Sequence, residues 1–308
     1  MRYLLKFIPI LLLILAAVYL LPFLSKFDLD KLFLVTPLSL FMVGILFVII
    51  NFLNVLYFHL IIHDISSTPF SYKLLPVLLA SYTMNFTGPL KLSMPTRVLL
   101  FKLVLGIPYG GGVAVVMLTT ALDVAVVAVL VLTMAAWVFV APLAGLLLGA
   151  GIVLVLLGLV AIFKRLPYRV IQRPEWLRSF LLDTARLSPT TFLYVLGISA
   201  AKSLLTALAG WFILTDLGTT CKLPQFALAY FASHLAGVVS LIPWGIGIKD
   251  ASLAELLSRF GTSVATSVTF VALDRIIWLL IPVVIGLLAG WQLGVGALIR
   301  SANEEMRT

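Results

Sequence analysis

Long apolar stretches separated by short polar ones follow one another along almost the whole chain. Six of them are close to or above the ~20 apolar residues that cross a bilayer as a helix. They are residues 4–24, 33–62, 111–134, 143–163, 191–216 and 263–291. Arg2 and Lys6 lie at the start of the first stretch, as in a signal peptide, but no small-residue cleavage site follows, so we expect a retained helix. The pattern predicts an all-α polytopic membrane protein with six transmembrane helices.

Two pairs of shorter apolar segments interrupt this series. Residues 74–87 and 90–105 meet at Gly88-Pro89, and residues 226–243 and 249–260 flank a bend that contains Pro243, Gly245 and Gly247. Segments of this length suit partial insertion better than a full crossing. We therefore expect two re-entrant helical hairpins. Eight full crossings are the alternative, because they would place the two termini on the same sides of the membrane as six crossings and two hairpins do.

The chain also contains an internal repeat. Residues 110–123 read GGGVAVVMLTTALD and residues 261–274 read GTSVATSVTFVALD, with six of 14 positions identical. Each block follows one of the broken hairpins and ends in an acid. Corresponding interrupted segments in two halves of a membrane protein indicate a transport site near the bilayer midplane. We expect two inverted repeats, with cores at residues 33–134 and 191–291.

Composition and charge agree with a single membrane domain over residues 1–308. The chain is 62% hydrophobic and 11% charged, and its longest polar stretch, residues 164–190, is too short for a catalytic domain. With the amino terminus inside, eleven Lys and Arg lie in inner segments and three in outer loops. This places both termini and the basic 164–190 loop in the cytoplasm of a cell-membrane protein. The formal charge of +9 is explained in this way, and nucleic acid is not expected as a partner.

Charged residues inside the apolar stretches are the best candidates for function. Asp123, Lys202 and the Asp274-Arg275 pair lie far from the ends of their stretches, and Asn51 and Asn54 share a helix face. A charge at mid-membrane costs roughly 2.5–3.5 kcal/mol, so it pairs or faces a wet cavity. One interpretation is structural, with Asp123 paired to Lys202 or Arg275 and holding the halves together. The other is a cavity that receives a polar or charged group.

The hairpins carry further charge. Arg97 suits bidentate contact with phosphate, and the backbone N–H groups at the start of a broken half-helix attract anions. Lys91 and Lys102 either join such a site or extend to the membrane surface. His234, near the second bend, either faces the cavity or packs inside. The predicted substrate-binding residues are Asn85, Lys91, Arg97, Asp123, Lys202, Lys249, Asp250, Asp274 and Arg275.

Signatures of catalysis are weak. His59 and His63 have the spacing of a zinc-binding helix, but Leu60 stands where its Glu is required. The segment before Lys202 lacks both glycines of a phosphate-binding loop. We therefore expect that the protein binds no metal or cofactor, has no ATPase activity and is not an enzyme.

Both hairpin blocks resemble the lysylphosphatidylglycerol synthase transmembrane (flippase-like) family. The first block runs from Asn85 through Pro89 and Arg97 to Asp123, and Ser93 and Met94 replace the family's Gly and Glu. The second reads LIPWGIGIKDASL from Leu241, with Trp244 for a Gly and Lys249-Asp250 for Arg-Glu. The resemblance implies a lipid-translocating membrane domain without the aminoacyl-transferase domain of full-length relatives.

Taken with the charged positions, the resemblance implies a lipid flippase or transporter that does not hydrolyse ATP. Its substrate is expected to be an anionic phospholipid, a glycolipid or an isoprenoid-linked lipid of the cell envelope, with Arg97 and Lys91 on the phosphate. The alternative is a scaffold that presents a lipid-linked substrate to a separate glycosyltransferase or other transferase.

Overall fold

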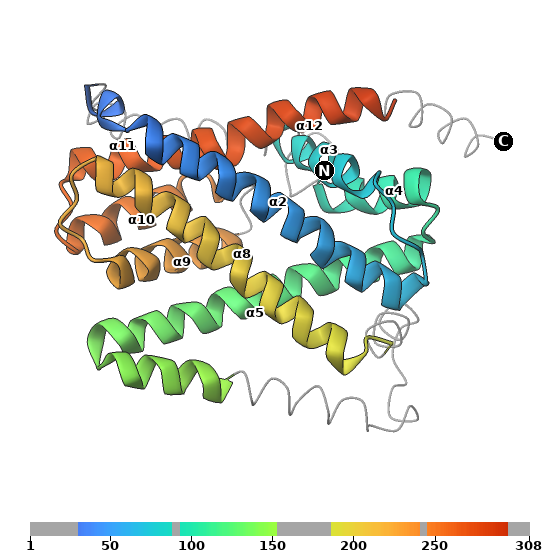
Figure 1. Cartoon of the computed structure of the whole chain (residues 1–308), viewed down its shortest axis with the longest axis horizontal. Coiled ribbons are helices and arrows are strands. Elements are labelled where there is room, and N and C mark those ends of the chain that lie inside the picture. Colours follow the sequence, from blue (N-terminus) through green and yellow to red (C-terminus); the bar gives the residue numbers. More distant parts are fainter. Residues whose placement is uncertain (1–29, 88–92, 153–185, 241–244, 295–308) are drawn as a thin grey trace, which may run out of the picture.

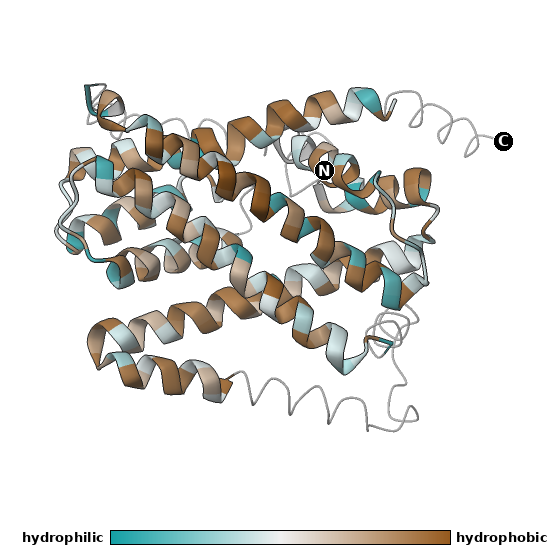
Figure 2. Ribbon diagram, in the orientation of Figure 1, coloured by the Kyte–Doolittle hydropathy of each residue, from teal (hydrophilic) through white to brown (hydrophobic). Residues whose placement is uncertain are grey.

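The computed structural model describes residues 30–87, 93–152, 186–240 and 245–294. Within these ranges every regular element is a helix (Figure 1). Four helices are long and apolar enough to cross a membrane: α2 (Pro37–Ser66), α5 (Tyr109–Phe139), α8 (Pro189–Asp216) and the run Val264–Gln292. Apolar residues cover most of their length (Figure 2), and many face outward on α2, where Phe41, Val48 and Phe52 are exposed. This outer surface matches a hydrocarbon environment.

The spans predicted at 33–62, 111–134, 191–216 and 263–291 are confirmed as helices, with ends shifted by a few residues. The stretch at 4–24 lies outside the described residues. The stretch at 143–163 is described only in part, as the short apolar helix Pro142–Ile152 that follows a turn at Val140.

The last span contains three elements in one continuous run. Helix α11 (Val264–Arg275) continues into a π-helical turn, η4 (Ile276–Leu280), and then into α12 (Ile281–Gln292). Pro282 explains the wide turn, because its ring clashes with the carbonyl four residues earlier in a regular α-helix. The irregularity follows directly after Asp274 and Arg275.

Each pair of shorter segments forms two helices. The first pair is α3 (Leu74–Thr87) and α4 (Ser93–Leu105), and the second is α9 (Leu223–Val239) and α10 (Ile248–Arg259). The predicted bend residues Gly88, Pro89 and Pro243 lie outside the described residues. Gly245 and Gly247 are described, and both have positive φ, 60° and 87°. Glycine adopts this conformation at no steric cost, so it suits the second bend.

Helices α2 and α8 pack side by side and run antiparallel through the centre of the molecule (Figure 1). A hydrogen bond at each end joins the last turn of one helix to the start of the other. The backbone N–H of Thr36 donates to Asp216 at 2.8 Å, and that of Ser188 donates to Asp64 at 2.9 Å. Each carboxylate therefore caps the amino-terminal end of the other helix, where unpaired N–H groups favour negative charge.

Two further contacts join the first half of the chain to the second. Helix α3 packs against α12, and α9 packs against α5. At the first contact the backbones meet closely, because a Cβ on Gly286 would overlap the carbonyl oxygen of Leu79. Small residues allow such close packing between membrane helices.

Candidate functional site

A cavity of about 370 Å³ lies between the two halves. Its wall combines charged, polar and apolar side chains from α2, α3, α5 and α8 through α12. The described residues that line it are Phe47, Ile50, Asn51, Asn54, Tyr82, Asp123, Val127, Lys202, Ser203, Thr206, Tyr230, Phe231, His234, Gly237, Val238, Gly245, Lys249, Asp274, Arg275, Trp278, Leu279 and Pro282. Asn51, Asp123 and Lys202 stand close to the midpoints of α2, α5 and α8. The cavity is therefore at mid-membrane depth if these helices span the bilayer.

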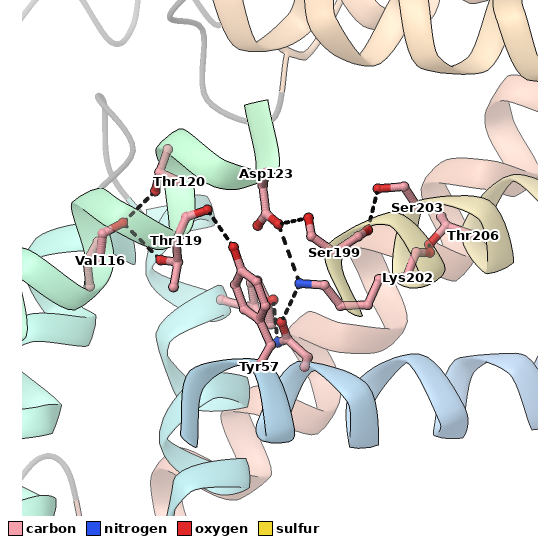
Figure 3. Close-up of polar contacts among 11 residues, drawn as sticks. Tyr57, Val116, Thr119, Thr120, Asp123, Ser199, Lys202, Ser203 and Thr206 are labelled. Carbon is pink, nitrogen blue, oxygen red and sulfur yellow. Dashed lines mark hydrogen bonds and ion pairs between the residues drawn. The ribbon is translucent and has the colours of Figure 1, made fainter. Parts of the chain in front are cut away.

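The first charged group on the wall joins α5 to α8 (Figure 3). Lys202 Nζ lies 3.6 Å from Asp123 Oδ1, and Ser199 Oγ donates a hydrogen bond to the same oxygen. Lys202 also donates to Asn54 Oδ1 at 3.2 Å, and its Nζ lies 3.9 Å from the centre of the Tyr57 ring. These contacts offset the cost of placing an ammonium group in the membrane. Of the two partners expected for Asp123, the structure selects Lys202.

The second charged group joins α10 to α11. Lys249 Nζ lies 2.8 Å from Asp274 Oδ2, and Tyr230 donates to the other oxygen of Asp274 at 3.0 Å. The neighbouring Arg275 donates from Nε to Asp250 Oδ1 at 2.6 Å. Asp250 also accepts the backbone N–H of Gly247 at 2.9 Å. One carboxylate therefore holds both the start of α10 and the arginine of the last span.

The backbone comes unusually close to this second group. A Cβ on Gly245 would lie 2.6 Å from the Cα of Gly237, and one on Gly237 would lie 3.1 Å from the Cβ of Lys249. Residues with side chains do not fit this approach. The two glycines therefore leave room for Lys249 next to the bend, where its ammonium pairs with Asp274.

The two groups differ in how accessible their carboxylates are. The Asp123 side chain is 45% exposed, whereas that of Asp274 is 3% exposed. The Asp123–Lys202 pair is also longer than the Asp274–Lys249 pair. The cavity is thus lined by one open ion pair, Asp123–Lys202, and one closed ion pair, Asp274–Lys249.

Arg97 lies behind the wall. Its Nε donates to Ser81 at 3.1 Å, and its guanidinium stacks near Phe58 and Tyr82, 4.9 and 5.4 Å from the ring centres. Within the part of the chain that the structure describes, no carboxylate lies within ion-pair distance of it. Tyr82 lines the cavity, whereas Arg97 does not. Lys91 lies outside the described residues, and the side chain of Asn85, in the last turn of α3, is not described either.

Sequence reasoning missed the neutral residues that hold the charged ones. Ser199 precedes Lys202 by three residues, and Tyr57 follows Asn54 by three, so each pair shares a helix face. That spacing could have identified Ser199 and Tyr57 as neighbours of the polar residues. Tyr230 gave none, because its partner Asp274 lies on a distant helix.

The comparison with known families assigns the chain. The family described as the lysylphosphatidylglycerol synthase TM region matches residues 6–286. The chain belongs to this family. Together with the four apolar helices, membership in the lysylphosphatidylglycerol synthase TM family makes it a multi-pass membrane protein and confirms the resemblance noted in the hairpin blocks.

One relative of the chain is the UPF0104 membrane protein PH1989 of Pyrococcus horikoshii. The two are 31% identical over 131 residues, 42% of this chain and 35% of the relative. The match thus spans about a third of the relative's length. No solved structure matches the chain.

Proposed function

We propose that this protein transports an anionic lipid across the membrane without hydrolysing ATP. The observation that carries the proposal is a cavity with charged walls at the midpoints of apolar helices. Charges at this depth are costly and mark substrate or ion pathways. The wall is also amphipathic, since Phe47, Trp278 and Leu279 line it together with Lys202 and Asp123. A lipid head group and the first part of its tails match both kinds of surface.

The open ion pair is the entry point in this proposal. A head-group phosphate replaces Asp123 as the partner of Lys202, because the ammonium already faces the cavity and its carboxylate is 45% exposed. Asp123 then accepts a hydrogen bond from a hydroxyl or amine of the head group. The closed pair of Lys249 and Asp274 forms another part of the wall. Arg97 joins the site only if the first hairpin moves, which would bring its guanidinium past Tyr82.

Movement of the hairpins follows from an inverted-repeat architecture, which we also propose. Helices α2 and α8 are antiparallel, and each is followed by a hairpin after a short loop. The two hairpins therefore begin at opposite ends of the central pair, and Figure 1 draws them on opposite sides of the molecule. Each packs on the long span of the other half. Rocking of one half against the other would then open the cavity to each face in turn.

The test is lipid flipping in proteoliposomes with fluorescent phosphatidylglycerol and phosphatidylcholine. Lys202→Met and Asp123→Asn should each slow movement of the anionic lipid by about tenfold or more, because each removes one charge-assisted contact. Glu255→Gln is the matched control, since Glu255 pairs with Arg259 in an exposed position away from the cavity. Flipping no faster than in protein-free vesicles would contradict transport, and lipid binding without flipping would favour the scaffold alternative.

A further inference from the structure

Among the described residues that line the cavity, each of the three cations is paired with a carboxylate, and Arg97, which has no carboxylate partner among the described residues, does not line it. Lys202 is paired with Asp123, Lys249 with Asp274, and Arg275 with Asp250. An anionic head group that enters therefore adds a net negative charge at mid-membrane depth. Such a charge is unfavourable unless a positive charge arrives with it. The phosphodiester of a phospholipid head group stays ionised near neutral pH. The compensating positive charge must therefore come from the protein or from solution.

His234 is placed to supply that charge. It lies on α9 and lines the cavity, its side chain is exposed there, and within the described residues neither ring nitrogen has a hydrogen-bond or ion-pair partner. Every other ionisable side chain on the described part of the wall has a hydrogen-bond or ion-pair partner. The charged groups that face it are Asp123 of α5, Lys202 of α8, Lys249 of α10, and Asp274 and Arg275 of α11. An imidazole without a partner is the wall group that can take up a proton without breaking an existing ion pair.

We propose that His234 is the proton-binding residue of the site, so that an anionic head group and one proton occupy the cavity together. This inference rests on the proposed function. A proton from the aqueous phase binds the free ring nitrogen, and the resulting imidazolium donates a hydrogen bond to a head-group oxygen. The proton returns to water when the head group leaves, and no covalent bond of the lipid changes. A proton gradient then drives the lipid, because each transported anion carries one proton with it.

Linkage fixes the sign of the pH effect. If the head group favours the protonated imidazole, protonation favours the head group by the same factor. Affinity for an anionic lipid therefore rises as pH falls, by at most tenfold per pH unit for a single proton. The opposite slope, or a flat profile, is incompatible with the proposal.

The first experiment measures binding of short-chain dihexanoylphosphatidylglycerol to the full chain in phosphatidylcholine nanodiscs, between about pH 5.5 and pH 8, where an ordinary histidine titrates. The wild type should bind more tightly at the lower pH. His234→Gln keeps a polar side chain that cannot titrate, so its binding should be independent of pH and equal to that of wild type at the upper limit. His63→Gln is the matched control, because His63 is 62% exposed at the end of α2 and should leave the slope unchanged.

A second readout separates this inference from the proposed function. Proteoliposomes containing a trapped pH dye report proton movement while fluorescent phosphatidylglycerol is flipped. Flipping without proton movement, or a pH slope that survives His234→Gln and is lost in Asp123→Asn, overturns the role of His234 and leaves transport intact. Absence of lipid binding and flipping by the wild type at every pH overturns both.

Discussion

The Asp64 carboxylate, in the last turn of α2, accepts the backbone N–H of Ser188 at the start of α8, at 2.9 Å. The mirror contact joins Asp216 to Thr36 at 2.8 Å. In both cases a hydroxyl residue followed by proline begins the helix, and the partner helix supplies the acid. These two contacts fix the register of the central pair, from whose opposite ends the two hairpins begin.

Removal of either carboxylate should weaken the central pair to a similar extent. We expect Asp64→Ala and Asp216→Ala each to lower the free energy of unfolding by about 1–2 kcal/mol, because each leaves a helix start without its acceptor. Thermal denaturation in detergent measures the effect. Glu255→Ala, in an exposed pair, should change stability by less than about 0.5 kcal/mol. If the control variant were as damaging as the two cap variants, capping would not be the cause.

The closed ion pair should be more important for stability than the open one. Asp274→Ala leaves Lys249 charged in a site where both side chains are almost fully buried, at 3% and 11% exposure. Loss of one partner from a buried pair costs about 3–5 kcal/mol. Asp123→Ala should cost less, because its carboxylate is already partly exposed. Recovery of stability in the double variant Lys249→Met/Asp274→Leu would show that the unpaired charge is responsible, and failure to recover would point to packing.

The contact between α12 and α3 offers a test with its own internal control. Gly286→Ala should destabilise the protein by about 1–3 kcal/mol, since the added methyl group meets the backbone oxygen of Leu79, which cannot move alone. Gly290→Ala, one turn along the same face, places its methyl 3.7 Å from Ala80 and should be tolerated. Denaturation midpoints of the two variants decide the point. Equal effects would mean that helix propensity, not the close contact, sets the outcome.

Cys221 should react slowly in the folded protein. It lies in the loop between α8 and α9, is 4% exposed, and burial raises the pKa of its thiol to about 11. The raised pKa means that the folded state retains the proton, so this group's contribution to stability is lost as pH rises from about 9 toward 11. Maleimide labelling at neutral pH should be slow before denaturation and fast after it, with Cys221→Ser as the blank. Equal rates in both states would show that the thiol is accessible.

Much of the fold could be predicted from local pattern. The ends of α3, α8 and the last span lie within a few residues of the segments read from apolar length, and both shorter helix pairs were expected from their lengths. These features depend on hydrophobic length and on proline and glycine, which act over a few residues. The reciprocal caps are also visible in the sequence, because Thr36-Pro37 with Asp64 and Ser188-Pro189 with Asp216 share one spacing.

For the candidate site, the sequence predicts which charged residues belong to it but not how they pair. Asp123, Lys202, Asp274 and Arg275 stood out because ionised groups in apolar stretches are expensive, and all four line the cavity. Their pairing could not be read in the same way. Asp123 had two possible partners, and Arg275 is held instead by Asp250, which shares a short helix with Lys249.

Local sequence is enough to show that this is a membrane protein, roughly where its helices lie and which residues bring charge into the apolar stretches. These properties are local, since each depends on the free energy of moving a short segment from water into hydrocarbon. The packing of the helices determines which cation each carboxylate neutralises, that Arg97 does not line the cavity, and that His234 faces it without a partner among the described residues. Such pairings depend on distances between helices that are far apart in the chain, and those distances are set by packing of the whole molecule.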